Sequence, residues 1–385
     1  MFLLDVLIYV LFALVMIYFA KKSEQYYPRI NNADFYLKFY IISFAIISGV
    51  RWGVGTDFFS YATQFDKGVS AINLTNRSSE VLWIKFVELF SQLDLHFSLG
   101  MGLVGLVQFF FIYLSLKKWK VLFAFLPIVI FGGWFDLALW NGMRQMIVAC
   151  VFVYISKWIV ERKFWKYILV VWLMHYIHNS ALILIPLYFL PLKIQFSGKR
   201  NICMILFVIC FILGQTPQFQ NFVGLFTDFA QMFGYEDYVT QINAKLSGKD
   251  LETRALGPTM ISYAILCFAV IFYSPKLKIT FAEKIPYFEL WYNFSLIYSY
   301  GFFLFCNVSH IFLRPLSYFM MFLMLMLTLL LAYFKIIRDK KKYVLLVVLL
   351  WIGLVWTVFK LSTTNDFNFI TYKFIWNHSL NEIIL

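Results

Sequence analysis

Three arginines stand at the ends of long apolar runs or inside them. Arg51 ends one run, Arg144 lies a few residues into a second, and Arg314 lies inside a third. An Arg at membrane depth costs about 3 kcal/mol on insertion scales and by default faces the interior of a helix bundle as a functional candidate. Its planar guanidinium matches phosphate, so the three residues point to an anionic substrate that carries phosphate, with carboxylated sugars second. The structural alternative is an Arg that reaches the outer headgroups or pairs with Asp57 or Asp136.

Glycines and polar side chains follow the first arginine, in the run Arg-Trp-Gly-Val-Gly-Thr-Asp-Phe-Phe-Ser-Tyr over residues 51–61. Gly53 and Gly55 permit positive φ angles and a close approach of the backbone to a ligand. Asp57 supplies a carboxylate, and Tyr61 supplies a hydroxyl one helical turn later. A turn that ends a helix is the more common explanation of such glycines, so both interpretations stay open.

Two more segments place polar groups where lipid would reject them. The run Asn-Gly-Met-Arg-Gln opens an apolar stretch with Asn141, Arg144 and Gln145, which must face protein, a cavity or a ligand. His178 interrupts another apolar stretch and is either part of a polar helix cap or a neutral imidazole that acts as a base or hydrogen-bond partner. His175 lies three residues earlier, but no third ligand has suitable spacing, so we expect no metal.

The amino-acid composition indicates that these segments lie in a lipid bilayer. Of the 385 residues, 62% are hydrophobic and 14% are charged, whereas soluble domains have about 45–50% and about 25%. The apolar runs are long enough for membrane helices and lack the alternation of barrel strands. The sequence therefore predicts an all-α fold, a polytopic integral membrane bundle of about twelve transmembrane helices.

Apolar runs and basic loops together predict the topology. The spans are expected near residues 2–20, 36–50, 97–116, 121–137, 142–160, 164–177, 179–192, 201–214, 256–273, 286–304, 310–334 and 343–360. With the N-terminus outside, most of the 33 Lys and Arg residues fall in cytoplasmic loops. The net charge of +13 is then a topology signal and implies no nucleic-acid partner. The N-terminal run lacks a charged n-region and a cleavage site, so we expect a retained span.

Three stretches of the predicted single membrane domain, residues 1–385, are not simple spans. Residues 79–93 form an amphipathic helix, which we expect to lie flat on the outer surface within an extracytoplasmic loop, residues 51–96. Its apolar stripe is Leu82, Phe86, Leu89, Phe90 and Leu93. Residues 164–192 are predicted to be two short helices that meet near His178, or a re-entrant hairpin. Residues 215–255 form a large extracytoplasmic loop suited to a lid or binding element. The five cysteines lie in apolar segments and are expected to fill the core.

Four blocks carry a resemblance to a known family. They are Arg51-x-Gly-x-Gly-Thr-Asp57-Phe-x-x-Tyr61, Asn141-Gly-Met-Arg144-Gln145, His178-Asn-Ser180-Ala-Leu and Arg314-Pro-x-x-Tyr318-Phe. In this order the chain resembles the EpsG-like family of polytopic exopolysaccharide polymerases, which are related to Wzy-type O-antigen and capsule polymerases. The closing Tyr372-Lys-Phe-Ile also looks like the C-terminal end of that family.

The resemblance implies a metal-independent glycosyltransferase of the lipid-phosphosugar, GT-C-like type, without a cofactor, in the cell membrane. Such an enzyme moves the growing chain from undecaprenyl pyrophosphate onto a lipid-linked acceptor repeat unit at the outer face, with inversion at the anomeric carbon. Membrane lipid and the chain-length regulator and flippase of the same pathway are the implied partners.

Fixed cations stabilise a leaving pyrophosphate, so we assign Arg144 and Arg314 to it and Arg51 to the pyrophosphate or to site architecture. Asp57 or His178 is the expected base. The remaining substrate-binding candidates are Gly53, Gly55, Tyr61, Asn141, Gln145 and Tyr318.

Two other functions fit a bundle of this kind. A flippase of lipid-linked oligosaccharides needs similar helices and arginines, but its polar residues should spread through a central cavity, whereas here they gather at one face. A membrane sugar O-acyltransferase needs a histidine deep in the bundle and a cytoplasmic acyl donor, whereas His178 is predicted outside. It stays as the enzyme alternative because an error in the span count would reverse that placement.

Overall fold

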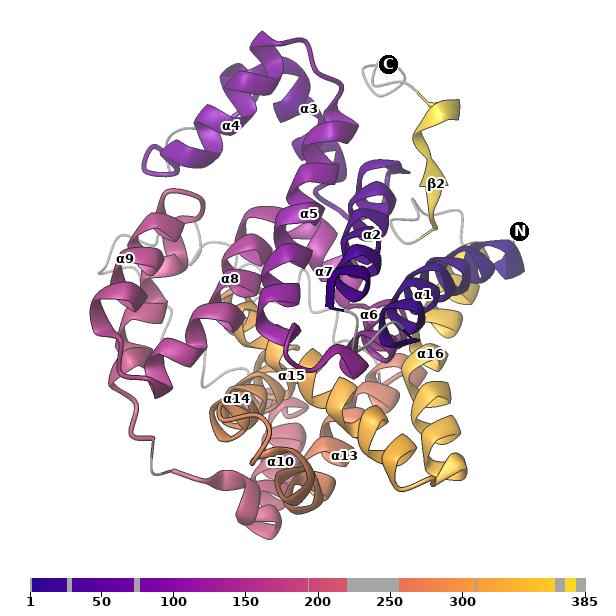
Figure 1. The fold of residues 1–385 in the computed structure, drawn as a ribbon, viewed down its shortest axis with the longest axis vertical. Helices are drawn as coiled ribbons and strands as arrows, with labels where there is room; N and C mark the ends of the chain where they lie inside the picture. Colours follow the sequence, from indigo (N-terminus) through magenta and orange to yellow (C-terminus); the bar gives the residue numbers. More distant parts are fainter. Residues whose placement is uncertain are drawn as a thin grey trace. The chain divides into compact units, whose positions relative to one another are not determined.

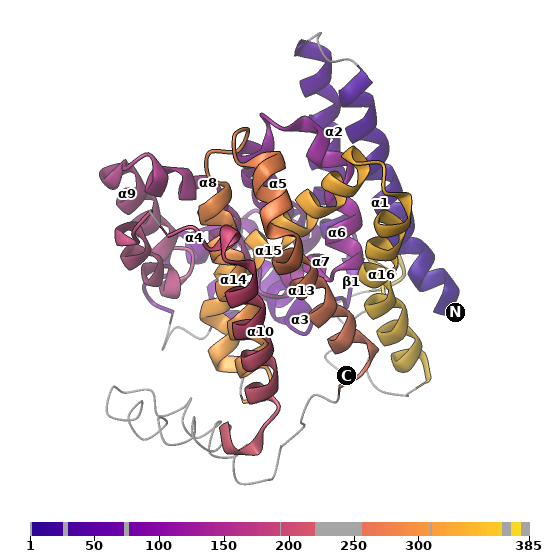
Figure 2. The same ribbon diagram turned by 90° about the horizontal axis from the view of Figure 1, so that it is seen from below.

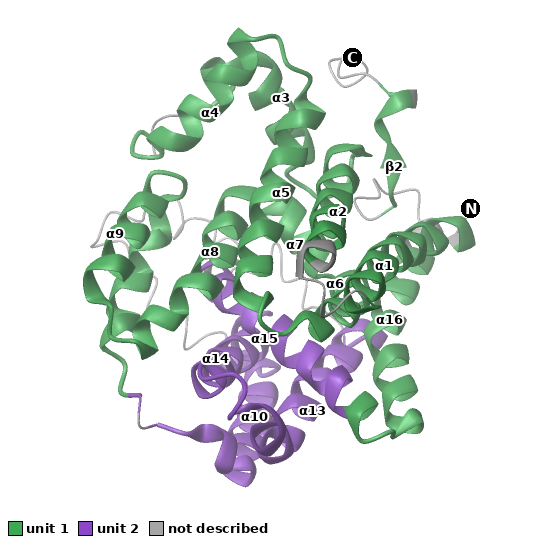
Figure 3. Cartoon of the chain, viewed as in Figure 1, with its two compact units in different colours: residues 1–191, 334–385 green, residues 192–333 purple. Residues whose placement is uncertain are grey.

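The computed structural model describes residues 2–25, 30–72, 77–192, 194–219, 256–308, 310–363 and 371–378. Its contacts divide the chain into two compact units, Met1–Pro191 with Phe334–Leu385 as unit 1, and Leu192–Tyr333 as unit 2 (Figure 3). Most of the predicted extracytoplasmic loop 215–255 lies outside the described residues, from residue 220 onward.

Both units are built from helices. Unit 1 contains α1 (Phe2–Gln25), α2 (Ile30–Gly49), β1 (Arg51–Trp52), α3 (Phe58–Lys67), η1 (Gly68–Ala71), α4 (Val81–Gln92), α5 (Phe97–Leu116), η2 (Lys120–Ala124), α6 (Leu126–Gly132), α7 (Phe135–Asn141), α8 (Met143–Val160), α9 (Phe164–His175), η3 (Asn179–Phe189), α16 (Lys340–Thr363), β2 (Lys373–Phe374) and η5 (Ile375–Asn377). Unit 2 contains η4 (Phe196–Gly198), α10 (Arg200–Gly214), α13 (Pro258–Phe281), α14 (Phe288–Phe305) and most of α15 (His310–Ile336).

The helices are those of a multi-pass membrane protein. Among the described residues, six helices are long and apolar enough to cross a membrane. They are Leu3–Gln25, Phe97–Leu116, Met143–Val160, Pro258–Phe281, Phe312–Ile336 and Lys340–Lys360. A seventh span is possible if the bent pair α6 and α7 counts as one. The predicted all-α class is therefore confirmed.

Small residues and aromatic rings hold the N-terminal helices of unit 1 together. Helices α1 and α2 lie side by side in both views (Figures 1 and 2). Helix α2 also packs against α5, where a Cβ on Gly49 would lie 2.7 Å from the carbonyl oxygen of Ser98. Phe44 and Phe109 stack across the same contact with ring centroids 3.7 Å apart. Small residues that let helix backbones approach are typical of packing in lipid.

The predicted span 121–137 is broken. Helices α6 and α7 meet at an angle of 73°, and Trp134 between them has a φ angle of +64°. A left-handed residue cannot continue an α-helix. The bend turns α7 so that Asn141, at its end, lies against the loop that follows β1, as described below.

The stretch 164–192 forms a hairpin of two short helices, which confirms the prediction that it is split near His178. Helix α9 runs in one direction and η3 returns along it. The hydroxyl of Tyr167 in α9 donates to the carbonyl oxygen of Leu184 in η3 at 2.6 Å. Arg162, just before α9, donates to the carbonyl oxygen of Tyr188 at 3.0 Å. His178 and Arg162 therefore lie at opposite ends of the hairpin.

The C-terminal segment returns to the loop that carries Arg51. Strand β2 pairs antiparallel with β1, with Arg51 opposite Phe374 and Trp52 opposite Lys373. The ring of His378 stacks on Trp52 at a centroid distance of 5.2 Å. This two-stranded ladder is the only sheet in the described parts of the chain. Within unit 1, this ladder joins the first sequence block, which begins at Arg51, to the C-terminal segment that begins at Tyr372.

The predicted apolar stripe of the amphipathic segment is divided in the structure. Helix α4 covers most of that segment, but its buried residues are Trp83, Val87 and Phe90. Leu82 and Leu89 point away from the protein, as does Leu93 just after the helix. The apolar residues of α4 thus have two different surroundings.

Unit 2 packs through aromatic rings. Phe207 of α10 contacts Phe303 of α14 at a centroid distance of 5.3 Å, and Phe294 of α14 contacts Phe322 of α15 at 4.9 Å. A partly buried hydrogen bond from Ser197 to Glu289 joins η4 to α14. The arginine-bearing block at residues 314–319 lies in α15.

Candidate functional site

A buried carboxylate joins the two most polar blocks of unit 1. Glu80 forms an ion pair with Arg144 through one oxygen. Its other oxygen lies 3.1 Å from Nδ1 of His178 and accepts a hydrogen bond from the backbone N–H of Asn179, also at 3.1 Å. Glu80 and Arg144 are both buried. Glu80, Arg144 and His178 therefore form one connected group, which we call the central triad.

The hairpin of helices brings the triad together. Arg144 stands at the start of α8, and His178 follows the end of α9. Because α8 and α9 are consecutive and joined by a short turn, these two positions lie at the same end of the pair. The start of α4 supplies the third member, since the backbone N–H of Leu82 donates to the carbonyl oxygen of Tyr176 at 3.0 Å. Figure 1 shows α4 beside the end of α9.

Hydrogen bonds fix the protonation of the triad. Burial alone would raise the pKa of Glu80, but the hydrogen bond from His178, the charge of Arg144 and the N–H of Asn179 together hold this pKa below its usual value. A carboxylate can only accept hydrogen bonds, so Nδ1 of His178 carries the proton. In the neutral imidazole, Nε2 is then an acceptor. The side chain of His178 is 24% exposed, so a ligand can reach it.

Aromatic rings surround the guanidinium of Arg144. It lies 5.8 Å from the ring centroid of Trp83 and 6.0 Å from that of Tyr61. Such cation–π contacts favour a charged, desolvated guanidinium. Among the described residues, Nε of Arg144 has no hydrogen-bond partner. The side chain is thus held by one carboxylate, by a hydrogen bond with Tyr61 and by two rings.

Arg77 is a second cation beside the triad, and it was not among the predicted site residues. Burial is the main cause that lowers its pKa, and the positive charge of Arg144 adds to this, while Glu80, Tyr61 and Asp57 act in the opposite direction. The backbone also joins the two, because the N–H of Glu80 donates to the carbonyl oxygen of Arg77 at 3.0 Å. Two like charges at one place favour an anionic ligand.

The loop after β1 is held by Asn141. The side-chain oxygen of Asn141 accepts hydrogen bonds from Oγ1 of Thr56 and from the backbone N–H of Asp57, each at 2.8 Å. Gly55 has a φ angle of +92°, and a Cβ there would lie 3.2 Å from the same oxygen. Glycine is therefore required here for two reasons: the backbone has a positive φ angle, and a side chain would crowd Asn141. Asp57 itself is exposed at the start of α3.

Arg51 is surrounded by protein. Its guanidinium donates to the carbonyl oxygens of Ser48 and Trp140 and lies 5.4 Å from the ring of Trp140. The residue is fully buried, and burial lowers its pKa to about 10, so it stays charged at neutral pH. These contacts join the end of α2 to α7. They favour the architectural role over contact with a pyrophosphate.

The other predicted residues fall into two groups. Gly53, with a φ angle of +69°, and Tyr61 belong to the same loop and helix of unit 1 as Asp57. Gln145 is half-buried next to Arg144 in α8. Arg314 and Tyr318 belong to α15 of unit 2, where Arg314 is exposed and Tyr318 is buried. The described residues contain no group of three metal-ligating side chains.

The ion pair of Glu80 predicts a pH dependence of stability. Its folded pKa is lowered below the ordinary value of 4.5, so its stabilising contribution is full above pH 4.5 and is lost as the pH falls through the lower folded value. We expect the difference in thermal unfolding temperature between the wild-type protein and Glu80→Gln not to shrink from pH 7 to pH 5, and to shrink below pH 4.5. A difference that shrinks already between pH 7 and pH 5 would contradict the assignment.

The contacts of Asn141 predict a loss of activity without loss of the fold. Asn141→Ala removes two hydrogen bonds, worth about 1 kcal/mol each, and frees the loop that carries Asp57. We expect the activity of the protein to fall about tenfold while the amount of protein in the membrane falls less than twofold. Asn201→Ala, an exposed change in unit 2, is the control and should leave both quantities unchanged. Normal activity of Asn141→Ala would show that the loop needs no such support.

The comparisons with curated proteins and with solved structures find no match. The family comparison does: the model of the EpsG family matches residues 34–374, which include all four sequence blocks and end at β2. EpsG is an exopolysaccharide polymerase-like family. Because the match covers nearly the whole chain, the protein belongs to the EpsG family.

Proposed function

We propose that this protein polymerises the repeat units of a surface polysaccharide, whether exopolysaccharide, capsule or O-antigen. The growing chain moves from undecaprenyl pyrophosphate to a lipid-linked acceptor repeat unit. The reaction takes place at the extracytoplasmic face of the cell membrane and needs no metal or cofactor. The single observation that carries the proposal is the central triad, in which one buried carboxylate forms an ion pair with Arg144 and a hydrogen bond with His178.

His178 acts as the general base. With Nδ1–H donating to Glu80, Nε2 is free to take the proton from the acceptor hydroxyl. The oxygen of that hydroxyl then bonds to the anomeric carbon of the donor sugar. The bond from this carbon to the pyrophosphate oxygen breaks, and its electron pair leaves with the pyrophosphate. Glu80 stabilises the imidazolium that forms, as the buried carboxylate does in a Ser-His-Asp triad.

Arg144 stabilises the leaving group. Negative charge grows on the pyrophosphate as the glycosidic bond breaks, and a fixed cation in a site with little water opposes that charge strongly. Arg77, beside the triad, adds a second positive charge. Gln145 and the exposed loop of Asp57 bind the sugars.

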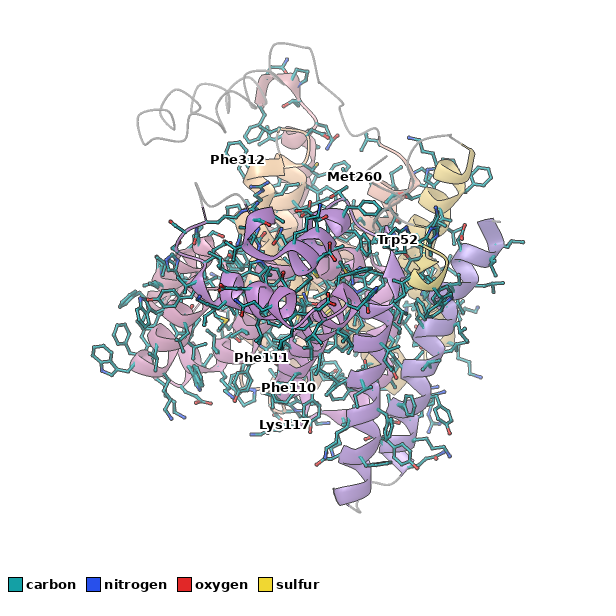
Figure 4. All side chains as sticks on the ribbon, turned by 90° about the horizontal axis from the view of Figure 1, so that it is seen from above. Trp52, Phe110, Phe111, Lys117, Met260 and Phe312 are labelled. Atoms are coloured by element: carbon teal, nitrogen blue, oxygen red, sulfur yellow. The ribbon has the colours of Figure 1, made fainter. Side chains whose placement is uncertain are left out.

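The topology favours the outer face. Arg144 and His178 lie at one end of the α8–α9 pair, and the basic turn of Arg162 and Lys163 lies at the other. Likewise, Lys117 ends α5, whereas Trp52 contacts Phe97 at its start, and Figure 4 shows Lys117 and Trp52 well apart. Basic turns mark the cytoplasmic side. We retain the bundle of about twelve membrane helices, including the short ones, and its likeness to GT-C glycosyltransferases as part of this proposal.

The proposed function is tested in a strain that lacks the gene. We expect single lipid-linked repeat units to accumulate on the outer leaflet, where a membrane-impermeant probe detects them, and long polymer to be absent. Repeat units that face the cytoplasm would instead identify a flippase. Full-length polymer that lacks an acyl group would identify an acyltransferase. The flippase and chain-length regulator of the pathway are the expected partners.

The identity of the base is tested by two substitutions. His178→Ala should reduce the rate of elongation at least about 100-fold, because positioned general bases contribute 10²- to 10⁴-fold. Asp57→Asn should reduce it about tenfold or less, since the proposal gives Asp57 a role in binding. The measurement is the initial rate of elongation in isolated membranes at equal protein. The reverse order of the two effects would transfer the role of base to Asp57.

A further inference from the structure

The surface of α4 is divided into three strips along the helix. At 100° per residue, Trp83, Val87 and Phe90 share one strip, and they are 2%, 0% and 4% exposed. Leu82, Leu89 and Leu93 share a second strip, and they are 47%, 50% and 58% exposed. The third strip, beside the second, contains the polar residues Lys85, Glu88 and Gln92, and at its start Val81, which is 44% exposed.

Contacts within the protein account for the position of the first strip only. The indole N–H of Trp83 donates to Gln64 of α3 at 3.0 Å, and the ring of Phe90 contacts Phe65 of α3 at a centroid distance of 5.3 Å. These contacts fix the rotation of α4 about its axis. The leucine strip is therefore turned outward by the packing itself, although water is a poor surrounding for three exposed leucines in line.

The surroundings of α4 indicate what covers the leucine strip. The first turn of α4 is hydrogen-bonded to Tyr176, at the end of α9. Helix α9 has its own outward apolar residues, Trp165, Leu169 and Trp172, as expected of a helix in a membrane protein. The start of α4 thus lies at the end of a helix that has an apolar outer surface. The polar strip, which includes the ion pair between Lys85 and Glu88 at 2.8 Å, is suited to water.

We propose that α4 is embedded in the surface of the lipid bilayer, with Leu82, Leu89 and Leu93 among the acyl chains and Lys85 and Gln92 in water. Helices with one apolar and one polar strip lie in the membrane interface in this way, with the apolar residues about 5–10 Å below the headgroups. The occupant of the leucine strip is therefore membrane lipid. A protein partner or a second copy of the chain would be a different result.

This contact also positions the site. Glu80 is the N-cap residue of α4, so the depth and tilt of the helix determine where the carboxylate meets Arg144 and His178. Lipid on one side and α3 on the other hold α4 in place. Glu80 is therefore a positioning residue whose location depends on the bilayer. The placement of α4 does not depend on the proposed polymerase activity.

The placement is tested by spin labels on cysteines introduced one at a time into the full-length protein, which is reconstituted in lipid vesicles. Leu89→Cys and Leu82→Cys should be relaxed by oxygen, which concentrates in lipid, at least about threefold more than by a water-soluble nickel chelate. Lys85→Cys and Gln92→Cys should show the opposite preference. The wild-type chain, in which four of the five cysteines are buried, provides the labelling blank.

Two results would overturn the proposal. If all four labels prefer the nickel chelate, the whole outer surface of α4 faces water. If the labels at Leu82 and Leu89 are protected from both reagents, protein covers the strip. Neither result depends on sugar transfer, so failure of this proposal is distinct from failure of the polymerase assignment.

The link to the site is tested by a charge in the leucine strip. Leu89→Glu should lift α4 from the lipid and reduce polymer yield at least about tenfold, whereas Leu89→Ile should retain it. Lys85→Glu places the same charge one turn away on the polar strip and should change the yield less than twofold. Equal yields from Leu89→Glu and Lys85→Glu would contradict a role of lipid contact in positioning Glu80.

Discussion

Glu80→Gln is expected to reduce the rate of polymer elongation at least about 100-fold while the protein still inserts into the membrane. The amide has the size of the carboxylate but no charge, so Arg144 is left buried without its counter-charge. Removing one partner of a buried ion pair destabilises a protein by about 3 to 5 kcal/mol. The amide also fails to stabilise an imidazolium on His178. The measurement is the elongation rate in isolated membranes, normalised to the amount of protein.

Glu88→Gln is the matched control for this substitution. Glu88 lies on the same helix, and its partner Lys85 is largely exposed, so the ion pair contributes little. We expect less than a twofold change in elongation. Normal elongation by Glu80→Gln would show that the buried carboxylate is dispensable, and the triad would then be structural.

Arg144→Lys is expected to shorten the polymer and reduce its yield at least about tenfold. The ammonium keeps the positive charge but loses the planar fork that binds phosphate through two parallel hydrogen bonds. It also loses the guanidinium contacts with Trp83 and Tyr61. Chain-length profiles on gels and the amount of protein in the membrane are the two measurements.

Arg162→Lys is the control for the arginine. Arg162 donates to backbone carbonyls at the other end of the hairpin, and we expect less than a threefold change in yield. A fully active Arg144→Lys protein would contradict bidentate binding of the pyrophosphate. If both variants lost activity together with protein, the effect would be one of folding.

The helices were largely predictable from the sequence. The thickness of the bilayer determines how long an apolar run must be, and charged residues mark where each run ends. The split of residues 164–192 could be predicted too, since His178 and its polar neighbours interrupt an apolar run. The sharp bend at Trp134 could not. It depends on one left-handed residue whose type does not require that conformation. The pairing of β1 with β2 joins residues more than 300 positions apart, which local patterns do not specify.

The site was half predictable. Arg144 and His178 were identified because each interrupts an apolar run, where a polar side chain needs a partner. Glu80 belongs to the segment 79–93, whose sequence predicts a surface helix, where an acidic residue is ordinarily solvated. Its helical phase, three residues before Trp83 and seven before Val87, places it on the strip that the structure buries. An acidic residue on a face that packs against protein needs a buried partner, so Glu80 could have been identified from this position. The leucine face is the more hydrophobic of the two, however, and its sequence pattern predicts that it, rather than the face of Glu80, is buried.

The central claim is that the protein itself transfers sugar chains through the group formed by Glu80, Arg144 and His178. The most direct measurement uses purified full-length protein in lipid vesicles, supplied only with undecaprenyl-pyrophosphate-linked repeat units and a chelator of divalent metals. We predict a ladder of products, one molecule of undecaprenyl pyrophosphate released for each bond formed, and no ladder with Glu80→Gln or His178→Ala. Repeat units that stay single in the presence of wild-type protein, or a ladder that both variants produce at the wild-type rate, would contradict the account.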